Sequence, residues 1–297
     1  MQVSDELDVL SEILNEPSQS ITISTDRTTV MVDEPANPFP ALSPQQESPV
    51  GASPNIDVAL QAMLEKFSVK PEDYRRKAKK ILLYGPPGSG KTVEACSSQK
   101  FKTYLVAVEP GGIVLRKHPE CANTIIMDFA AAKNPVRAAE SFIDYVDSGQ
   151  IDDCELLVLD TFTSLRERDL RNILEAEGKS VIMDKNADEY RPNSQNMKRI
   201  GQKISDLNCH AIIICHSEQI KDSVTGGLYT RPVLSNSVQQ ALMGMFDAVC
   251  YYEALGEGVE RFRKLTINPV ANLMAKNRLS LDEVSYVNPP IDMLLEA

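Results

Sequence analysis

A glycine-rich segment that directly follows an apolar run constrains this chain more than any other feature. Residues 81–84 read Ile-Leu-Leu-Tyr, and residues 85–92 match the pattern G-x-x-x-x-G-K-T. After a strand and before a helix, this spacing predicts a loop whose backbone N–H groups face phosphate oxygens, because glycine leaves room where a Cβ would intrude. The start of the following helix favours an anion at the same place. The pattern therefore predicts a P-loop that binds a nucleoside triphosphate, with a glycine-rich surface turn as the alternative.

The motif also predicts individual roles. Lys91 is placed to reach the β- and γ-phosphates, and the Thr92 hydroxyl is placed to ligate Mg²⁺. The predicted nucleotide-binding residues are Gly85, Pro86, Pro87, Gly88, Ser89, Gly90, Lys91, Thr92 and Val93. We therefore expect ATP and Mg²⁺ as ligands.

A second segment has the form of a Walker B strand. Residues 155–161 read E-L-L-V-L-D-T, so four apolar residues precede Asp160. Downstream of a P-loop, an aspartate at this position holds Mg²⁺ directly or through water. The alternative for Asp160 is that its carboxylate caps the next helix.

Two further polar residues follow predicted strands. Glu109 comes after the apolar residues 104–108, and His216 comes after the apolar residues 211–215. In doubly wound sheets ligands gather at the carboxyl ends of strands, where a carboxylate can deprotonate an attacking water. A histidine there can hydrogen-bond the γ-phosphate. The alternatives are a turn-forming acid and an ordinary strand-end histidine.

The first 55 residues differ in composition from the rest. They hold seven of the 18 prolines and nine Asp or Glu against one Arg, which places −8 of the net charge of −11 in this segment. This composition predicts a disordered tail over residues 1–55 and a near-neutral folded domain over residues 56–297. The acidity of the whole chain therefore does not exclude a nucleic-acid partner. Leu7, Leu10 and Leu14 share one helical face, which suits either a fraying helix or a docking helix for a partner.

Composition excludes several other classes. The six cysteines form no C-x-x-C pair and show no Cys/His ligand spacing, so we expect reduced thiols in a reducing compartment. No stretch approaches 18 consecutive apolar residues, and the N-terminus lacks a signal-peptide pattern. We expect a cytoplasmic protein without membrane contact.

The periodicity predicts an α/β fold. Near-continuous apolar strands separated by helices indicate a mostly parallel sheet covered on both faces. Residues 219–236 show little apolar periodicity and are predicted to form a long loop. The predicted strands are 81–84, 104–108, 124–127, 156–159 and 211–215, the predicted helices are 56–67, 130–146 and 195–207, and antiparallel edge strands are predicted at 248–252, 262–266 and 273–275.

Six segments together resemble the RecA-like ATPase core, and more closely its compact phage version. That version comprises single-strand-annealing and recombination proteins, often described as phage nucleotide-binding or AAA-domain proteins. The segments are G-P-P-G-S-G-K-T at 85–92, V-E-P-G-G at 108–112, L-L-V-L-D-T-F-T-S-L at 156–165, I-I-I-C-H-S-E at 212–218, F-D at 246–247 and A-K-N-R at 275–278. The resemblance covers roughly residues 75–285 and implies a RecA-like P-loop fold.

The resemblance also implies roles for residues that spacing alone leaves open. It implies that Glu109 is the hydrolytic base and that His216 senses the γ-phosphate, where RecA itself carries Gln. It implies that Lys276 and Arg278 reach into the nucleotide of a neighbouring subunit, and that residues 221–237 bind single-stranded DNA. A plain flexible insertion remains the alternative for that segment, and simple solvent exposure remains the alternative for the basic pair.

The function implied by the resemblance is a Mg²⁺-dependent, DNA-stimulated ATPase in DNA recombination or single-strand annealing. Such a protein acts as a homo-oligomer on single-stranded DNA, is encoded by a phage and works in the cytoplasm of the bacterial host. The tail is then a docking segment for a single-strand-binding or replication protein. Two alternatives stay open: an AAA+-type helicase loader, and a nucleotide-gated binding module whose turnover is incidental.

Overall fold

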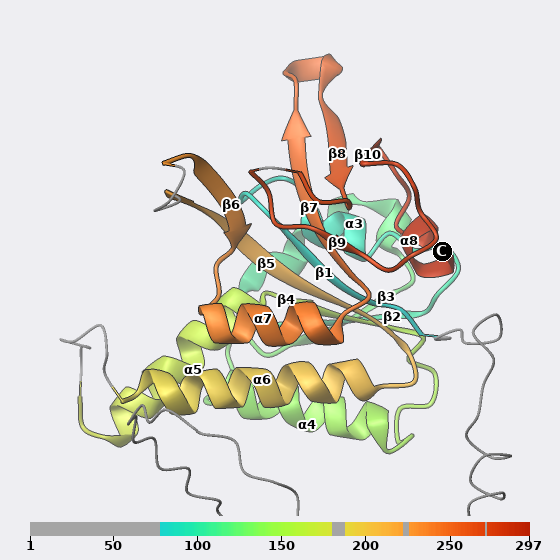
Figure 1. The fold of residues 1–297 in the computed structure, drawn as a ribbon. Helices are drawn as coiled ribbons and strands as arrows, with labels where there is room; N and C mark the ends of the chain where they lie inside the picture. The colour runs from blue at the N-terminus through green and yellow to red at the C-terminus, as the bar shows by residue number, and fades with distance from the viewer. Residues whose placement is uncertain (1–77, 180–187, 222–225, 271) are drawn as a thin grey trace, which may run out of the picture. The chain divides into compact units, whose positions relative to one another are not determined.

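A ten-stranded sheet forms the centre of the computed structural model, which describes residues 78–179, 188–221, 226–270 and 272–297 (Figure 1). The predicted tail and the predicted helix at 56–67 lie outside these ranges. Six neighbouring strands run in the order β7-β1-β5-β4-β2-β3, and each neighbouring pair is parallel. Their bounds are β1 Lys80–Gly85, β2 Thr103–Ala107, β3 Thr124–Asp128, β4 Leu156–Asp160, β5 His210–Lys221 and β7 Ala248–Leu255. The predicted α/β fold with a mostly parallel sheet is confirmed.

The C-terminal strands extend the sheet antiparallel to it, as predicted. Strand β8 pairs with β7, and β10 pairs with β8. Two other strands pair off the main path, β6 with β5 and β9 with β7. The bounds are β6 Leu228–Pro232, β8 Phe262–Thr266, β9 Lys276–Asn277 and β10 Ser285–Val287.

Two predictions about these edge strands are wrong in detail. The segment 248–252 was predicted to be antiparallel, but β7 lies parallel to β1, with Ala248 opposite Ile81. The reason is helix α7, Asn236–Met245, whose crossover returns the chain to the sheet in the parallel direction. The predicted strand at 273–275 is replaced by the short β9, and Leu273 forms isolated bridges instead.

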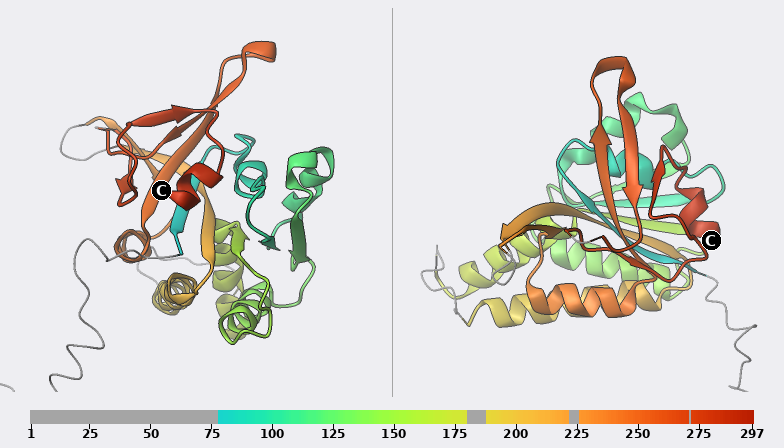
Figure 2. Two further views of the ribbon diagram at one scale, coloured as in Figure 1. Left: turned by 90° about the vertical axis from the view of Figure 1, so that its right-hand side faces the viewer. Right: turned by 45° about the horizontal axis from the view of Figure 1, so that its top comes forward.

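Helices cover both faces of the sheet (Figures 1 and 2). On one face lie α4 to α7, and on the other lie α3, α8 and the 3₁₀ segment η2. Helices α5, α7 and α8 have no counterpart in the sequence prediction. The remaining bounds are α3 Lys91–Ala95, η2 Pro110–Lys117, η3 Pro119–Cys121, α4 Pro135–Asp147, α5 Phe162–Ala176, α6 Tyr190–Asp206, η4 Gly258–Glu260 and α8 Asp292–Glu296.

The parallel strands face two separate cores with alternate side chains. Leu82 and Tyr84 of β1 pack toward α4, α5 and α6, whereas Ile81 and Leu83 pack toward α3 and α8. Because both faces are covered, the strand is apolar at every one of these positions. Because β1 is packed on both faces, its position in the sheet is fixed, and so is the position of the loop that follows Tyr84.

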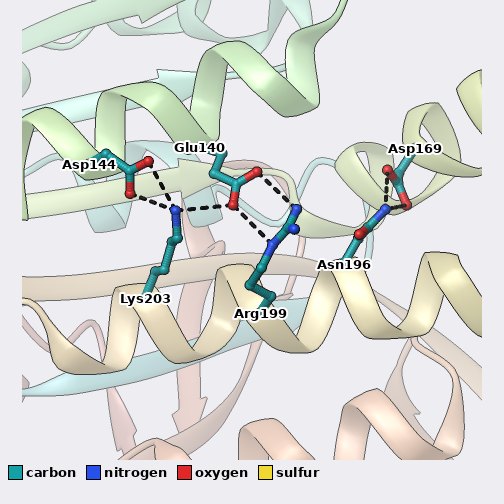
Figure 3. A network of polar contacts seen from close by, with 6 residues as sticks. All are labelled: Glu140, Asp144, Asp169, Asn196, Arg199 and Lys203. Carbon is teal, nitrogen blue, oxygen red and sulfur yellow. Dashed lines mark hydrogen bonds and ion pairs between the residues drawn. The ribbon is translucent and has the colours of Figure 1, made fainter.

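Ionic contacts join α4 to α6 on the outer surface of the helical layer (Figure 3). Arg199 Nε lies 3.0 Å from Glu140 Oε1, and Lys203 Nζ lies 2.7 Å from Asp144 Oδ1 and 3.1 Å from Glu140 Oε1. Exposed pairs of this kind contribute less than about 1 kcal/mol each. They help to fix how α4 and α6 are aligned, while the buried apolar faces of the helices supply most of the stabilisation of the fold.

The predicted long loop at 219–236 is largely a β-hairpin. Strand β5 continues to Lys221, and β6 pairs antiparallel to it, with Glu218 opposite Arg231. Arg231 Nε donates to Glu218 Oε1 at 2.8 Å. Cross-strand charge pairs stabilise a two-stranded ribbon, and polar side chains on both of its faces give no apolar alternation. That is why the sequence pattern missed it.

Candidate functional site

A cleft of 740 Å³ lies at the carboxyl ends of the parallel strands. Because β1, β2, β4 and β5 are parallel, the loops that follow them meet at one edge of the sheet. The sequence-predicted residues that line the cleft are Pro87, Gly88, Gly90, Lys91, Thr92, Val93, Glu109, Asp160 and His216. The tertiary structure therefore brings together four segments that lie as far as 131 positions apart in the chain, from Gly85 to His216.

The backbone of the predicted P-loop requires glycine at three positions, and one of them is Gly88, whose φ of 71° lies in the left-handed region. A Cβ at Gly85 would lie 2.0 Å from the carbonyl oxygen of Tyr252 on β7, which no side chain tolerates. Gly90 has φ 96°, in the left-handed region that favours glycine. These glycines let the loop pass tightly between β7 and the start of α3.

Lys91 is buried at the base of the loop. Its ammonium donates to Gly85 O at 2.9 Å and to Pro86 O at 2.8 Å. Burial lowers the pKa of Lys91, and the nearby carboxylate of Asp160 opposes that shift. The Ser89 hydroxyl of the same loop is also buried and has no hydrogen-bond partner among the described residues. The Lys91 ammonium and the Ser89 hydroxyl are hydrogen-bond donors that still have capacity for an acceptor. Such donors, held in one loop, are suited to bind the oxygens of a phosphate chain.

Thr92 and Asp160 face each other across the cleft. The Thr92 hydroxyl donates to Asp160 Oδ2 at 2.8 Å. Asp160 is 5% exposed, and its burial raises the pKa of its carboxyl above the ordinary value. A buried carboxylate needs a cation beside it, and paired hydroxyl and carboxylate oxygens are the ligands that Mg²⁺ prefers. The residues present therefore fit a magnesium ion.

Glu109 follows β2, and its carboxylate accepts hydrogen bonds from hydroxyl groups that follow the neighbouring strand β4. Thr161 Oγ1 donates to Glu109 Oε1 at 3.1 Å, and the Ser164 hydroxyl donates to the same oxygen. His216 Nε2 lies 3.7 Å from that oxygen. The His216 imidazole lowers the pKa of Glu109 below its ordinary value, so the group is a carboxylate at neutral pH. An ionised, half-exposed carboxylate in a cleft can accept a proton from water.

His216 lies at the point on β5 where the strand leaves the parallel sheet. Its backbone N–H donates to Thr163 Oγ1 at 3.1 Å, which ties the strand to the start of α5. Its Nδ1 is buried and has no hydrogen-bond partner among the described residues. The imidazole thus faces Glu109 with Nε2, and its Nδ1 points into a buried position of the site.

Lys276 and Arg278 lie away from this cleft. Lys276 Nζ donates to the carbonyl oxygens of Met243 and Phe246, the latter at 2.5 Å, and Arg278 donates to Gly244 O at 3.3 Å. Both side chains therefore cap the C-terminal end of α7, where cations are favourable. The structure does not bring this pair to the P-loop of the same chain.

The β5–β6 hairpin presents the residues predicted to contact nucleic acid. Leu228 is 61% exposed, and Tyr229 is half-buried beside it. Arg231 is held by Glu218 and also by Asn236, whose Oδ1 lies 2.6 Å from Arg231 NH1. Arg231 thus has local partners, while the exposed face of the hairpin carries Lys221 and Leu228.

Some residues of the site had no assigned role in the sequence analysis. Thr161 and Ser164 belong to the segment that was recognised after β4, but their hydroxyl groups had no signal of their own. Arg261 and Arg263 line the cleft from the β7–β8 hairpin. No local pattern connects them to a loop about 170 residues earlier, so only the tertiary structure reveals them.

The chain is similar to several known proteins. A family model described as an AAA domain matches residues 77–279. Spastin from Naegleria gruberi is 36% identical over 98 residues, which cover 30% of this chain and 18% of that protein. The chain therefore spans less than a fifth of the length of this relative.

Two solved structures are similar with low identity. One is a RadB recombinase, with 17% identity, a TM-score of 0.42, and coverage of 70% of this chain and 86% of that one. The other is a KaiC-like protein from the archaeon Pyrococcus horikoshii, with 13% identity, a TM-score of 0.37, and coverage of 66% and 80%.

In the part of the chain that the structure describes, no helix is both long and apolar enough to cross a bilayer.

Proposed function

The chain belongs to the AAA-domain family, and on that premise we propose that it is a Mg²⁺-dependent ATPase that acts as a homo-oligomer on single-stranded DNA. Its role is then DNA recombination or single-strand annealing. The observation that carries the ATPase part is the meeting of Lys91, Thr92, Asp160 and Glu109 in one cleft. A phosphate loop, a pair of magnesium ligands and a carboxylate base are the parts that phosphoryl transfer to water needs.

Each residue has a distinct task in this reaction. Lys91 and the loop backbone bind the β- and γ-phosphates, and Thr92 and Asp160 would hold a magnesium ion. When bound, the ion neutralises charge on the phosphate oxygens. Glu109 orients the attacking water and accepts its proton. His216 lines the same cleft beside Glu109 and lies directly before the β5–β6 hairpin, so it can report the loss of the γ-phosphate to that hairpin.

The DNA-binding part of the proposal is supported by the hairpin that β5 forms beyond His216. A single strand of DNA is bound by cations along its backbone and by apolar or aromatic groups under its bases. Lys221, Leu228 and Tyr229 supply these chemistries on one short ribbon. Because β5 joins the ribbon directly to His216, ATP and DNA can affect each other's binding through a single strand.

The oligomeric part concerns Lys276 and Arg278. Hydrolysis in this design gains from cations that stabilise charge developing on the γ-phosphate. The basic pair lies away from its own P-loop, so it would serve the nucleotide of a neighbouring subunit. We also propose that the acidic tail is a docking segment for a single-strand-binding or replication protein. The protein is then encoded by a phage and works in the cytoplasm of the bacterial host.

The experiment that tests the proposal measures the ATPase rate with and without single-stranded DNA. We expect turnover that requires Mg²⁺ and rises when DNA is added. The Lys91→Ala variant should lose tight ATP binding in a calorimetric titration, because it lacks the charge that faces the phosphates. Unchanged ATP affinity in that variant would remove the basis of the proposal, and turnover indifferent to DNA would remove its DNA-dependent part.

The helicase-loader alternative predicts a helical lid domain, whereas the described residues that follow α7 form four strands, a 3₁₀ turn and the five-residue α8. The gated-module alternative differs in turnover. If Glu109→Gln leaves the rate unchanged, hydrolysis is incidental and that alternative replaces the one proposed.

A further inference from the structure

The β7–β8 hairpin extends over the P-loop from a distant part of the chain. Tyr251 of β7 lies opposite Tyr84 of β1, and β7 continues for four more residues to Leu255. At a rise of about 3.3 Å per residue, the hairpin projects about 13 Å past this pair. Figures 1 and 2 show it standing clear of the sheet on the side of α3.

Two arginines of this hairpin lie beside the loop, and one of them donates a hydrogen bond to it. Arg261 NH2 donates to Gly88 O at 3.2 Å. Arg263 Nε lies 3.0 Å from the position that a Cβ on Gly90 would occupy. Since the two arginines are separated by one residue on an extended segment, their side chains leave the same face of the strand.

The backbone around Arg263 is held in place. Asn288 Oδ1 accepts from the Arg263 backbone N–H at 2.7 Å, and the Asn288 N–H donates to Arg263 O at 2.8 Å. Beneath the side chain, the Tyr252 hydroxyl donates to Glu94 Oε2 at 2.8 Å. The Arg263 charge acts on both of these groups and opposes the rise in pKa that burial causes in them. Arg263 is therefore positioned in advance above the cleft.

The charge of the cleft indicates that these arginines favour anion binding. Among the described residues that line it, the carboxylates are Glu94, Glu109, Glu120 and Asp160, and the lysine or arginine residues are Lys91, Arg261 and Arg263. Without the two arginines, Lys91 alone would face four carboxyl groups. A nucleotide with Mg²⁺ still carries negative charge, so a cleft of that composition would repel it. Guanidinium groups suit phosphate because their planar fork can donate two parallel hydrogen bonds.

We propose that Arg261 and Arg263 bind the phosphate chain of the nucleotide from within the same subunit. This inference rests on the proposed ATPase function and adds two phosphate-binding residues to it. The hairpin then acts as a second wall of the site, opposite the loop that follows β2. Because both arginines belong to the same chain as the P-loop, a single subunit supplies these contacts without a neighbour.

The test is a calorimetric titration of the nucleotide-free protein with Mg²⁺–ATP and, separately, with Mg²⁺–tripolyphosphate. Arg261→Gln and Arg263→Gln remove the charge but keep a side chain of similar size. We expect each to weaken binding of both ligands about tenfold, since a charge-assisted hydrogen bond is lost. Lys264→Gln is the matched control, because it removes one positive charge from the same strand at a residue that does not line the cleft. It should change either affinity less than about twofold.

Three outcomes would overturn the inference. The first is ATP binding within about threefold of wild type in both Gln variants. The second is a loss for ATP but not for tripolyphosphate, which would assign the arginines to the base or ribose. The third is a loss as large in Lys264→Gln, which would show a general charge effect. Arg263→Lys should keep most of the affinity, and melting curves of all variants separate a lost contact from a lost fold.

The titration separates this inference from the function on which it rests. If wild-type protein binds ATP and Lys91→Ala does not, the ATP-binding function stands whatever the arginine variants do. If wild-type protein binds neither ligand, both the function and the arginine contacts are refuted.

Discussion

Replacing Glu109 by glutamine tests the proposed chemistry most directly. The structure gives the carboxylate two hydroxyl donors, Thr161 and Ser164, on the same oxygen. An amide oxygen can accept both hydrogen bonds, so Glu109→Gln keeps these contacts and loses only the ability to take up a proton. We therefore expect the free energy of unfolding to change by less than about 1 kcal/mol.

The effect on turnover should be far larger. A positioned general base contributes about 10²- to 10⁴-fold to the rate. At 1.36 kcal/mol per factor of ten, that is about 2.7 to 5.4 kcal/mol in the activation barrier. Steady-state assays should show kcat reduced by this factor, with ATP affinity preserved in a calorimetric titration. Glu167→Gln, the same change at an exposed position of α5, is the control and should leave kcat within about twofold.

The pH profile gives an independent measure of the same group. The His216 imidazole lowers the pKa of Glu109, so the base stays ionised as the pH falls and is lost only below the ordinary carboxyl range of about 4.3. His216→Ala should remove this effect and move the acidic limb of the kcat profile to higher pH. A kcat within about threefold of wild type in Glu109→Gln would refute the assignment of the base. An acidic limb that does not move in His216→Ala would refute the coupling.

Three further predictions concern the metal site, the basic pair and the tail. Burial raises the pKa of Asp160 in the folded state, so its contribution to stability is present below its unfolded pKa of about 3.9 and is lost as the pH rises through the folded value. Asp160→Asn should therefore raise the melting temperature of the nucleotide-free protein at pH 7 while abolishing Mg²⁺-dependent stabilisation by ATP; a lower melting temperature would contradict the first part. Changing Lys276 and Arg278 together to alanine should spare ATP binding but abolish DNA-stimulated hydrolysis, and mixing this protein with Lys91→Ala should restore part of the activity; no recovery despite co-assembly would leave the pair with the capping of α7 alone. Removing residues 1–55 should leave a folded ATPase, because their proline-rich, acidic composition supplies little to bury, and a large fall in melting temperature would disprove it.

The features that depend on local spacing could be predicted from the sequence. The tight approach of Gly85 to the Tyr252 carbonyl explains why glycine stands at the first position of the P-loop, and the motif predicted that loop without knowledge of its neighbour. Double burial makes the parallel strands apolar throughout, so their runs were visible as strands, and Asp160 was found from the end of one such run.

The features that depend on contacts between distant segments could not be predicted and appear only once the chain is folded. The direction of β7 follows from the crossover through α7, whose periodicity gave no clear signal. The ribbon of β5 and β6 is stabilised by cross-strand pairs such as Glu218 with Arg231, which leave no apolar pattern in the sequence.

The cleft shows the same division. Local pattern identified Lys91 and Glu109, because each stands at a fixed offset from a strand. Arg261 and Arg263 reach the loop only because β7 lies beside β1 and continues past its end. Strand pairing is a long-range interaction that fixes register across the whole sheet, so the second wall of the site exists only in the folded chain.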